Sequence, residues 1–279
     1  MSHALEAAIL RFAATVPVGE EADALAAFQQ LKDGLNAGTI RSAERDAGGV
    51  WHANAWVKAG ILLGFRLGRI RPMAEAGPFP FYDKDTWPLR SVGLADGVRI
   101  VPGGTSIRDG CYIAPGTVIL PPAFVNAGAY IDSGTMVDSH ALVGSCAQIG
   151  KRVHLSAGVQ IGGVLEPIGA LPVIIEDDVL VGGNGGVYEG TVVRERAVLA
   201  PGTILSGGTI VFDLVRDTSY RRAGERPLEI PAGAVVVPGS RPISSGPGQA
   251  LGLSLYAPVI VKYRDDKTDT SVRLEELLR

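Results

Sequence analysis

The residue types best suited to proton transfer lie close together in one segment, TMVDSH (Thr135–His140). Asp138 carries a carboxylate that can take a proton from a reacting group. His140 follows two residues later, and the unperturbed pKa of a histidine lies near neutrality. From the residues alone, the pair is more typical of two solvated turn residues, so its meaning depends on the elements that position it.

Neither cysteine suggests metal or redox chemistry. Cys111 and Cys146 form no C-x-x-C pair and no Cys/His spacing typical of a metal site, so we predict no metal and a structural role for both thiols. The segment Met1–Leu10 lacks the basic start and apolar core of a signal peptide, and no apolar run approaches the ~20 residues of a membrane span. Two thiols without a signal favour the cytoplasm.

Composition predicts a folded chain with many turns and argues against a nucleic-acid binder. The 279 residues carry 26 Lys and Arg against 29 Asp and Glu, a net charge of −3, without the basic excess typical of nucleic-acid binding. A hydrophobic content of 46% is enough to bury a core. Glycine is frequent, with 37 residues, whereas aromatic residues make up 6%. Tight turns around a thin aliphatic core would have this composition.

The first part of the chain is predicted to be helical. Apolar residues at helical spacing predict one helix around Leu5–Phe12, a second over Glu20–Asn36 and a third over Asn54–Leu67. The prolines between Arg71 and Pro88 predict an irregular segment. We therefore expect three regions, an α-helical domain, a second domain and a small C-terminal strand and helix region, over residues 1–98, 99–240 and 241–279.

From Val101 the sequence repeats with a period of six. Every sixth residue is Val, Ile or Leu as far as Ile161, and after a break at Gly163–Pro172 the register runs again from Ile175 to Val211. Two places before the aliphatic sites the first run has small residues, namely Thr105, Cys111, Thr117, Ala123, Ala129, Thr135, Ala141 and Ala147. Because strand side chains alternate between faces, both positions face one core. The pattern is that of a hexapeptide β-helix.

The rest of the chain departs from the repeat and then rejoins it. A second excursion runs from Val211 to about Leu228 and contains several arginines. Ile230 and Val236 are predicted to resume one last coil. We then expect a strand over Ser254–Lys262 and a short helix over Thr270–Arg279.

Several segments carry a resemblance to one enzyme family. They include VNAGAYIDSGTMVDSHALVGSCAQIGKRVHLSAGVQIGGVLEP (Val125–Pro167), IIEDDVLVGG (Ile174–Gly183) and WVKAGILLGFRL (Trp56–Leu67). These resemble the tetrahydrodipicolinate N-succinyltransferase family of hexapeptide-repeat acyltransferases, over nearly the whole chain. The resemblance implies a mainly β fold, a left-handed parallel β-helix with three hexapeptides per coil. The repeats would then build six coils over about 29 Å, in a homotrimer with sites between prisms.

The resemblance also implies a reaction. The family moves a succinyl group from succinyl-CoA to the amino group of ring-opened tetrahydrodipicolinate, a step of diaminopimelate and lysine biosynthesis, with acyl-CoA as co-substrate and no permanently bound cofactor. It implies that Asp138 contacts the substrate and is the base, and that Arg99 in VRIVP contacts the dicarboxylate, which a planar guanidinium suits. Lys262 and the cluster Arg216–Arg226 are candidates for the CoA phosphates. Neither a nucleic acid nor a membrane is expected as a partner.

Two departures from the family pattern fall near these residues. The family typically has GARSEVVEG where this chain has GGNGGVYEG (Gly182–Gly190), so Gly186 stands where the family has a Glu that is regarded as a second active-site carboxylate. The family reads MVDTWATVGS where this chain reads MVDSHALVGS, so His140 replaces a Trp. We therefore include His140 as a second catalytic candidate.

Three interpretations remain open at this stage. The chain is the ordinary succinyltransferase, a paralogue with another acyl donor such as acetyl-CoA or another acceptor in a specialised pathway of the tabtoxin type, or a non-catalytic scaffold. The retained Asp138 and Arg99 argue against the scaffold, whereas the missing Glu argues against the ordinary enzyme.

Overall fold

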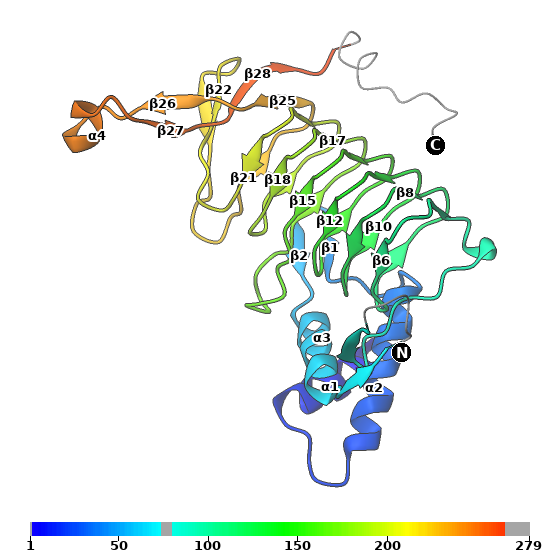
Figure 1. Cartoon of the computed structure of the whole chain (residues 1–279). Coiled ribbons are helices and arrows are strands. Elements are labelled where there is room, and N and C mark those ends of the chain that lie inside the picture. Colours follow the sequence, from blue (N-terminus) through cyan, green and yellow to red (C-terminus); the bar gives the residue numbers. More distant parts are fainter. Residues whose placement is uncertain (1, 74–79, 266–279) are drawn as a thin grey trace.

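A three-sided prism of parallel β-sheets forms the centre of the computed structural model, which describes residues 2–73 and 80–265 (Figure 1). The N-terminal helices lie beneath the prism, and an arm with β26 (Ser240–Pro242), α4 (Gly246–Ala250) and β27 (Ser254–Tyr256) projects from the end formed by the last coils. The predicted mainly β fold, a left-handed β-helix preceded by helices, is confirmed. None of the helices in the described part is long and apolar enough to cross a membrane.

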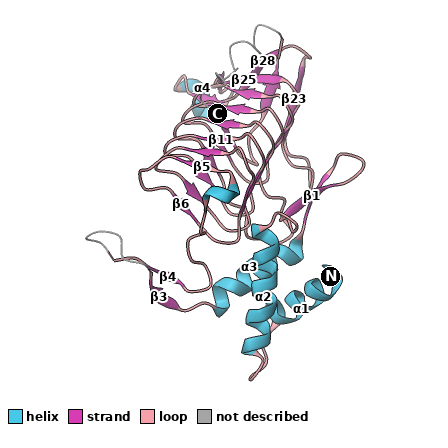
Figure 2. Ribbon diagram, turned by 90° about the vertical axis from the view of Figure 1, so that its right-hand side faces the viewer, coloured by secondary structure: helices cyan, strands magenta, loops and turns pink. Residues whose placement is uncertain are grey.

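Three helices lie together beneath the prism (Figure 2), and they pack on one another through their apolar stripes. They are α1 (Ser2–Ala14), α2 (Glu21–Asn36) and α3 (Ala55–Leu67), which confirms the three predicted helices. The helices approach closely because α3 carries Gly60 and Gly64 in its interior. A Cβ atom at either position would lie 2.2 Å from a side-chain atom of α2, of Leu31 and of Phe28 respectively.

Two antiparallel hairpins flank the helices, and neither was predicted. The first pairs β1 (Ala43–Arg45) with β2 (Trp51–Ala53) and lies over one face of the prism, where Trp51 Nε1 donates to Glu176 at 2.8 Å. The second pairs β3 (Ile70–Pro72) with β4 (Tyr82–Lys84). The prediction of an irregular Arg71–Pro88 segment is therefore wrong at these strands, because Pro72 occupies a strand end. A short 3-10 turn, η1 (Leu94–Asp96), precedes the prism.

The prism has three faces, which the chain visits in turn with one short strand on each. The long face is made of β5 (Arg99–Ile100), β8 (Val118–Ile119), β11 (Met136–Val137), β14 (His154–Leu155), β17 (Leu180–Val181), β20 (Val198–Leu199) and β25 (Ala234–Val237), continued by β28 (Val259–Tyr263), β22 (Val211–Asp213) and β23 (Thr218–Tyr220). The hairpin face, which the β1–β2 hairpin covers, is made of β7 (Tyr112–Ile113), β10 (Tyr130–Ile131), β13 (Gln148–Ile149), β16 (Ile174–Ile175), β19 (Val192–Val193) and β24 (Glu229–Ile230). The third face is made of β6 (Ser106–Ile107), β9 (Phe124–Val125), β12 (Leu142–Val143), β15 (Gln160–Ile161), β18 (Gly186–Val187) and β21 (Ile204–Leu205).

The aliphatic positions of the repeat point into the prism, as predicted. From Ile107 to Val211 each of them is at most 6% exposed. The first position differs, because Ile100 rather than Val101 pairs with Ile119. The first coil is thus one residue longer than the regular coils without an excursion, and the extra residue is accommodated in the glycine-containing turn after β5. As predicted, Ile230 and Val236 rejoin the core in β24 and β25.

The excursion Gly163–Pro172 leaves the prism between β15 and β16 and is held by the N-terminal helices. The side chain of Lys58 is fully buried, and its Nζ donates to the carbonyl oxygens of Pro167 at 3.1 Å and Ala170 at 2.7 Å. Desolvation lowers the pKa of Lys58. The two hydrogen bonds from its Nζ tie the excursion to helix α3.

The C-terminal region contains more elements than expected. The predicted strand over Ser254–Lys262 is two strands, β27 (Ser254–Tyr256) and β28, because Pro258 interrupts it. β27 pairs with β26 (Ser240–Pro242), and the short helix α4 (Gly246–Ala250) closes this arm. The predicted helix over Thr270–Arg279 lies outside the described residues.

Asp213 ties the second excursion to the C-terminal strand. It is 1% exposed and accepts hydrogen bonds from the Tyr263 hydroxyl at 2.6 Å and from the amides of Val215 and Arg216 at 2.9 and 3.0 Å. Burial acts to raise the pKa of Asp213, but these hydrogen bonds outweigh it and the pKa is lowered.

Replacing Asp213 with Asn is expected to lower the melting temperature near neutral pH. A carboxyl whose pKa is lower in the folded state stabilises the fold above its unfolded pKa, about 3.9, and this stabilisation is lost as the pH falls through the lower, folded pKa. The difference in melting temperature between wild type and D213N should therefore shrink when thermal unfolding is followed from pH 7 to below pH 4. A difference that stays constant over this range would contradict the assignment.

Candidate active site

One row of residues on the long face contains two of the sequence-predicted site residues. Strand register aligns Arg99 with Val118, Met136 and His154, and the same row continues through Leu180, Val198 and Val235 to Lys262. Asp138 directly follows β11, two residues after Met136. Since neighbouring strands are ~4.8 Å apart, Arg99 lies two strands, about 10 Å, from Met136, while Lys262 lies about 24 Å away along the stack. The structure thus places Arg99 on the same face as Asp138, two strands from Met136, and Lys262 at the far end of that face.

Asp138 is held in a defined orientation at the corner of the prism. Its Oδ1 accepts a hydrogen bond from the Ser139 amide at 2.7 Å, and its own amide donates to Leu155 O at 2.9 Å. Its Oδ2 lies 3.9 Å from Nε2 of His154 on the next coil. The Asp138 side chain is 27% exposed, so the carboxylate is ordered yet accessible to a substrate.

His140 lies in the turn after Asp138 and is exposed. Its φ angle is 62°, its amide donates to Pro122 O at 2.6 Å, and its carbonyl accepts from Gln160 Nε2 at 3.2 Å. These contacts give the backbone of His140 a structural role in the turn. A catalytic role of its imidazole stays a prediction.

The predicted phosphate-binding cations lie on the end of the prism formed by the last coils. Lys262 Nζ lies 3.5 Å from Asp265 Oδ1. In the cluster Arg216–Arg226, Arg216 lies 3.9 Å from the ring centre of Tyr263, and Arg222 Nε donates to Gly224 O at 3.2 Å. All four arginines of the cluster are exposed.

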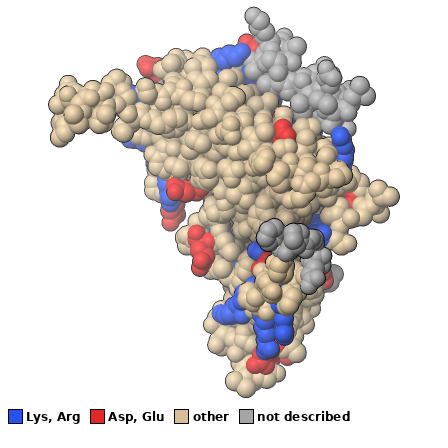
Figure 3. Space-filling model, in the orientation of Figure 1, with Lys and Arg blue, Asp and Glu red and all other residues tan. Residues whose placement is uncertain are grey.

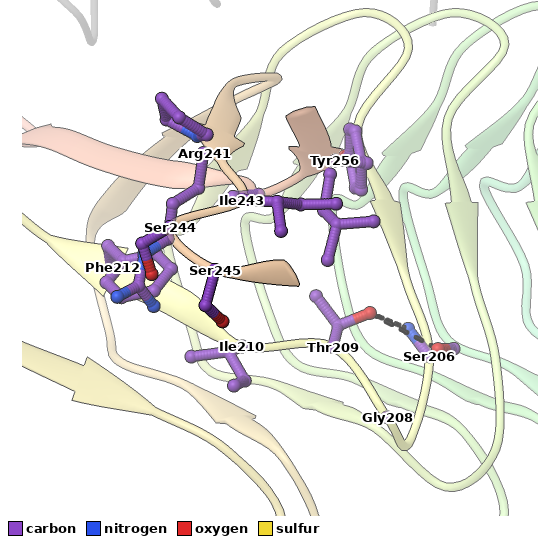
Figure 4. A pocket seen from close by; sticks show the side chains of 13 residues that line it. Ser206, Gly208, Thr209, Ile210, Phe212, Arg241, Ile243, Ser244, Ser245 and Tyr256 are labelled. Atoms are coloured by element: carbon purple, nitrogen blue, oxygen red, sulfur yellow. Dashed lines mark hydrogen bonds between the residues drawn. The ribbon is translucent and has the colours of Figure 1, made fainter. Parts of the chain in front are cut away.

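A cavity of about 610 Å³ lies where the arm leaves the prism (Figure 4). Its walls come from the turn after β21, which includes Ser206 and Thr209, and from the arm, which includes Arg241 and Tyr256. Arg241 is the charged residue of this lining, and its guanidinium carbon lies 5.3 Å from the ring centre of Phe212. Sequence reasoning missed Arg241, because a single exposed arginine carries no motif.

The two thiols lie in different cores. Cys111 is buried inside the prism, and Cys146 is buried between the prism and the helices. Burial raises the pKa of Cys111 to about 12 and that of Cys146 to about 11, so neither is a ready nucleophile at neutral pH. Within residues 2–73 and 80–265, no three His, Cys, Asp or Glu side chains are arranged to hold a metal ion.

Comparison with known proteins assigns the chain to a family. A model described as tetrahydrodipicolinate N-succinyltransferase N-terminal matches residues 3–67, and one described as hexapeptide repeat of succinyl-transferase matches residues 172–206. The 2,3,4,5-tetrahydropyridine-2,6-dicarboxylate N-succinyltransferase of Polynucleobacter asymbioticus is 46% identical over 94% of this chain and 92% of its own length. The chain belongs to this N-succinyltransferase family. Enzymes of the same name from Albidiferax ferrireducens and Acinetobacter baylyi are 46% and 44% identical, each over 92% of this chain and 90% of its own length.

In this member of the family, the departure at Gly186 is accompanied by a second one. The outward side of Gly186 is occupied by the ring of Tyr188, and a Cβ atom on Gly186 would lie 2.5 Å from Tyr188 Cε2 and 2.8 Å from its hydroxyl oxygen. Tyr188 stands where the family segment GARSEVVEG has Val. A glutamate at position 186 and the observed place of the Tyr188 ring exclude one another, so the two changes act as a pair.

Replacing Gly186 with Ala is therefore expected to destabilise the fold. Forcing a methyl group into an occupied place typically costs about 1–3 kcal/mol. The double variant Gly186→Ala with Tyr188→Val should recover the wild-type melting temperature, because the smaller side chain vacates the place. The melting temperatures of Gly186→Ala, of the double variant and of Tyr188→Val alone measure the destabilisation and its recovery. A G186A protein as stable as wild type would show that the ring moves aside freely.

The structure also brings forward a residue that sequence reasoning missed. His154 belongs to the quoted segment Val125–Pro167, but its distance of 16 residues from Asp138 hid the contact. Coils stack with a spacing of 18 residues here, so His154 lies directly over Met136, on the same outward side as Asp138. The six-residue period, multiplied by three, was the signal that could have found it.

Proposed function

We propose that this protein transfers a succinyl group from succinyl-CoA to the amino group of ring-opened tetrahydropyridine dicarboxylate. The names of its relatives state N-succinyl transfer on 2,3,4,5-tetrahydropyridine-2,6-dicarboxylate for those enzymes. The observation that carries the proposal is the pair formed by Asp138 and Arg99 on one face of the prism, an accessible carboxylate with a guanidinium two strands away. Family membership over 94% of the chain supports it.

In the proposed reaction Asp138 is the general base. It takes a proton from the substrate amine while the nitrogen bonds to the thioester carbonyl carbon. The C–S bond then breaks, and the sulfur leaves as CoA and takes up a proton. Arg99 binds a substrate carboxylate, because its planar guanidinium can donate two parallel hydrogen bonds. Both residues therefore act on the acceptor.

The acyl-CoA donor is proposed to extend along the prism toward the arm. The 610 Å³ cavity at the arm is open to a long ligand, and Arg241 in its wall can meet a phosphate. Lys262 and the exposed arginines of the cluster Arg216–Arg226 place further positive charge at the same end of the molecule. No permanently bound cofactor is part of this proposal.

We also propose that three copies assemble and that the site lies between two of them. Asp138 lies at the edge of the long face and Tyr188 on the third face, and both point outward, so a single chain does not enclose a substrate. The arm exposes Leu251, Leu253 and Leu255, which are 72%, 51% and 64% exposed, and its outer part is free of charge in the view of Figure 3. An apolar arm of this kind is expected to be covered. The two unpaired thiols support a reducing, cytoplasmic location.

A thiol-release assay tests the proposed function. The purified protein is given succinyl-CoA or acetyl-CoA together with tetrahydrodipicolinate or L-2-aminopimelate. Release of CoA should depend on the acceptor and be faster with succinyl-CoA. Faster release with acetyl-CoA, or no acceptor-dependent release with either donor, would overturn the proposal. Light scattering on the same sample should give three times the chain mass of 29.1 kDa.

A further inference from the structure

We propose that His154 is a positioning residue for Asp138 and that protonation of its ring switches the carboxylate out of its role as base. The proposal deepens the proposed function, since it rests on Asp138 acting on the amine. It starts from one contact, the 3.9 Å between His154 Nε2 and Asp138 Oδ2, which the stacking of two coils creates.

The geometry leaves one oxygen of Asp138 for chemistry and places His154 beside it. Oδ1 is engaged by the Ser139 amide at 2.7 Å, so the orientation of the carboxylate is set from that side. Oδ2 is on the side of His154, at a distance too long for a direct hydrogen bond but within the range of an ion pair. The state of the imidazole therefore acts on the oxygen that is left for the substrate.

His154 lies beside the Asp138 carboxylate with apolar neighbours in its row. In the row on the long face it lies between Met136 on β11 and Leu180 on β17, both apolar. The turn before β14 carries Lys151 and Arg152, and Arg152 is paired with Asp178 at 2.7 Å in two hydrogen bonds. The His154 side chain is 16% exposed, so solvent screens its interaction with Asp138 only in part.

The two states of the ring have opposite effects on the base. A neutral imidazole beside Asp138 fills the corner and keeps the carboxylate directed outward. A protonated imidazolium attracts Oδ2, draws it from the substrate and makes it a weaker proton acceptor. Succinyl transfer should therefore fall as the pH drops through the titration of His154, which for an unperturbed histidine is about 6.5.

The test is the pH profile of kcat and kcat/KM in wild type, His154→Gln and His154→Asn. His154→Gln should lower the plateau rate on the order of ten- to a hundredfold, the size of effect expected when a reacting group is slightly misplaced. It should also move the acid limb of the pH profile to lower pH, and a loss of packing alone would not do this. The matched control is His52→Gln, since His52 forms another His–Asp contact, 2.7 Å from Asp46, on the hairpin away from this site.

A double variant separates positioning from an independent role. If His154 acts through Asp138, then D138N with H154Q should be no slower than D138N alone. A plateau and acid limb unchanged from wild type in H154Q would overturn the proposal while leaving the proposed function intact. A D138N enzyme with normal turnover would instead overturn the base assignment itself.

A measurement that does not depend on enzyme activity tests the proposal even if the His154 variants do not fold. In NMR spectra the His154 ring is titrated in wild type and in D138N, which retains the shape of the side chain. Loss of a nearby negative charge should move the ring titration to lower pH. An unchanged midpoint would refute the coupling even if no substrate for the enzyme were turned over.

Discussion

Asp138→Asn is expected to slow succinyl transfer about 10²–10⁴-fold, the usual effect of removing a general base. The amide keeps the shape of the side chain and can still accept the hydrogen bond from the Ser139 amide, now 2.7 Å long, so the turn should be retained. The readout is kcat and kcat/KM for CoA release with succinyl-CoA and the acceptor. Calorimetric binding of CoA should be unchanged, because the proposed donor site is at the other end of the prism.

The matched control for this variant is Asp132→Asn. Asp132 is the corresponding carboxylate at another corner, where its Oδ1 accepts from the Ser133 amide at 2.7 Å in the same type of turn. Its replacement should leave turnover nearly unchanged.

Near-normal turnover of D138N on the true acceptor would remove Asp138 from the mechanism. His140→Ala then shows whether the exposed imidazole two residues away takes any part of the work.

Val143→Asp is expected to destabilise the prism by several kcal/mol, enough to prevent folding. Val143 is fully buried in a core one side chain thick, where its neighbours are the aliphatic residues of the other two faces. A carboxylate there has no partner and loses its hydration. Soluble expression and circular dichroism measure the effect.

Leu142→Asp is the matched control, since Leu142 precedes Val143 in β12 and points outward. It should give a folded protein whose spectrum resembles that of wild type. A soluble, fully folded V143D protein would show that the inward register of the coil is wrong. The pair of variants therefore tests the alternation on which the description of the fold depends.

The hexapeptide repeat was visible in the sequence because its cause is local. Each coil places one aliphatic side chain per face against the axis, so the same spacing recurs wherever a coil exists, and the positions from Ile107 to Val211 are buried as predicted. The helices were predictable for a similar reason, the 3.6-residue spacing of one apolar stripe. The first coil was misread by one residue, since the pairing of Ile100 with Ile119 depends on how the turn after β5 closes.

The β1–β2 hairpin was not predictable, because the residues that hold it lie far along the chain. Trp51 anchors this hairpin by donating a hydrogen bond from its indole nitrogen to Glu176. Ala43 is buried against Ile174 and Val192 of the hairpin face. Three-residue strands carry too little local preference to be recognised without that surface. The same holds for Lys58, whose burial depends on carbonyl oxygens more than a hundred residues away.

For the candidate site, the sequence alone determined the residue types and the outward orientation of one side chain, that of Asp138. It showed that Asp138 follows an inward Val137 and must face outward. The family resemblance, not the residues themselves, implied a carboxylate where this chain has Gly186. Only the tertiary structure decided which side chains meet. Stacking of coils placed His154 against Asp138, and the ring of Tyr188 took the space that a side chain at Gly186 would fill. The physical reason is that side-chain alternation is set by neighbours in the chain, whereas contact between coils is set by the length of each turn and the register that closes it.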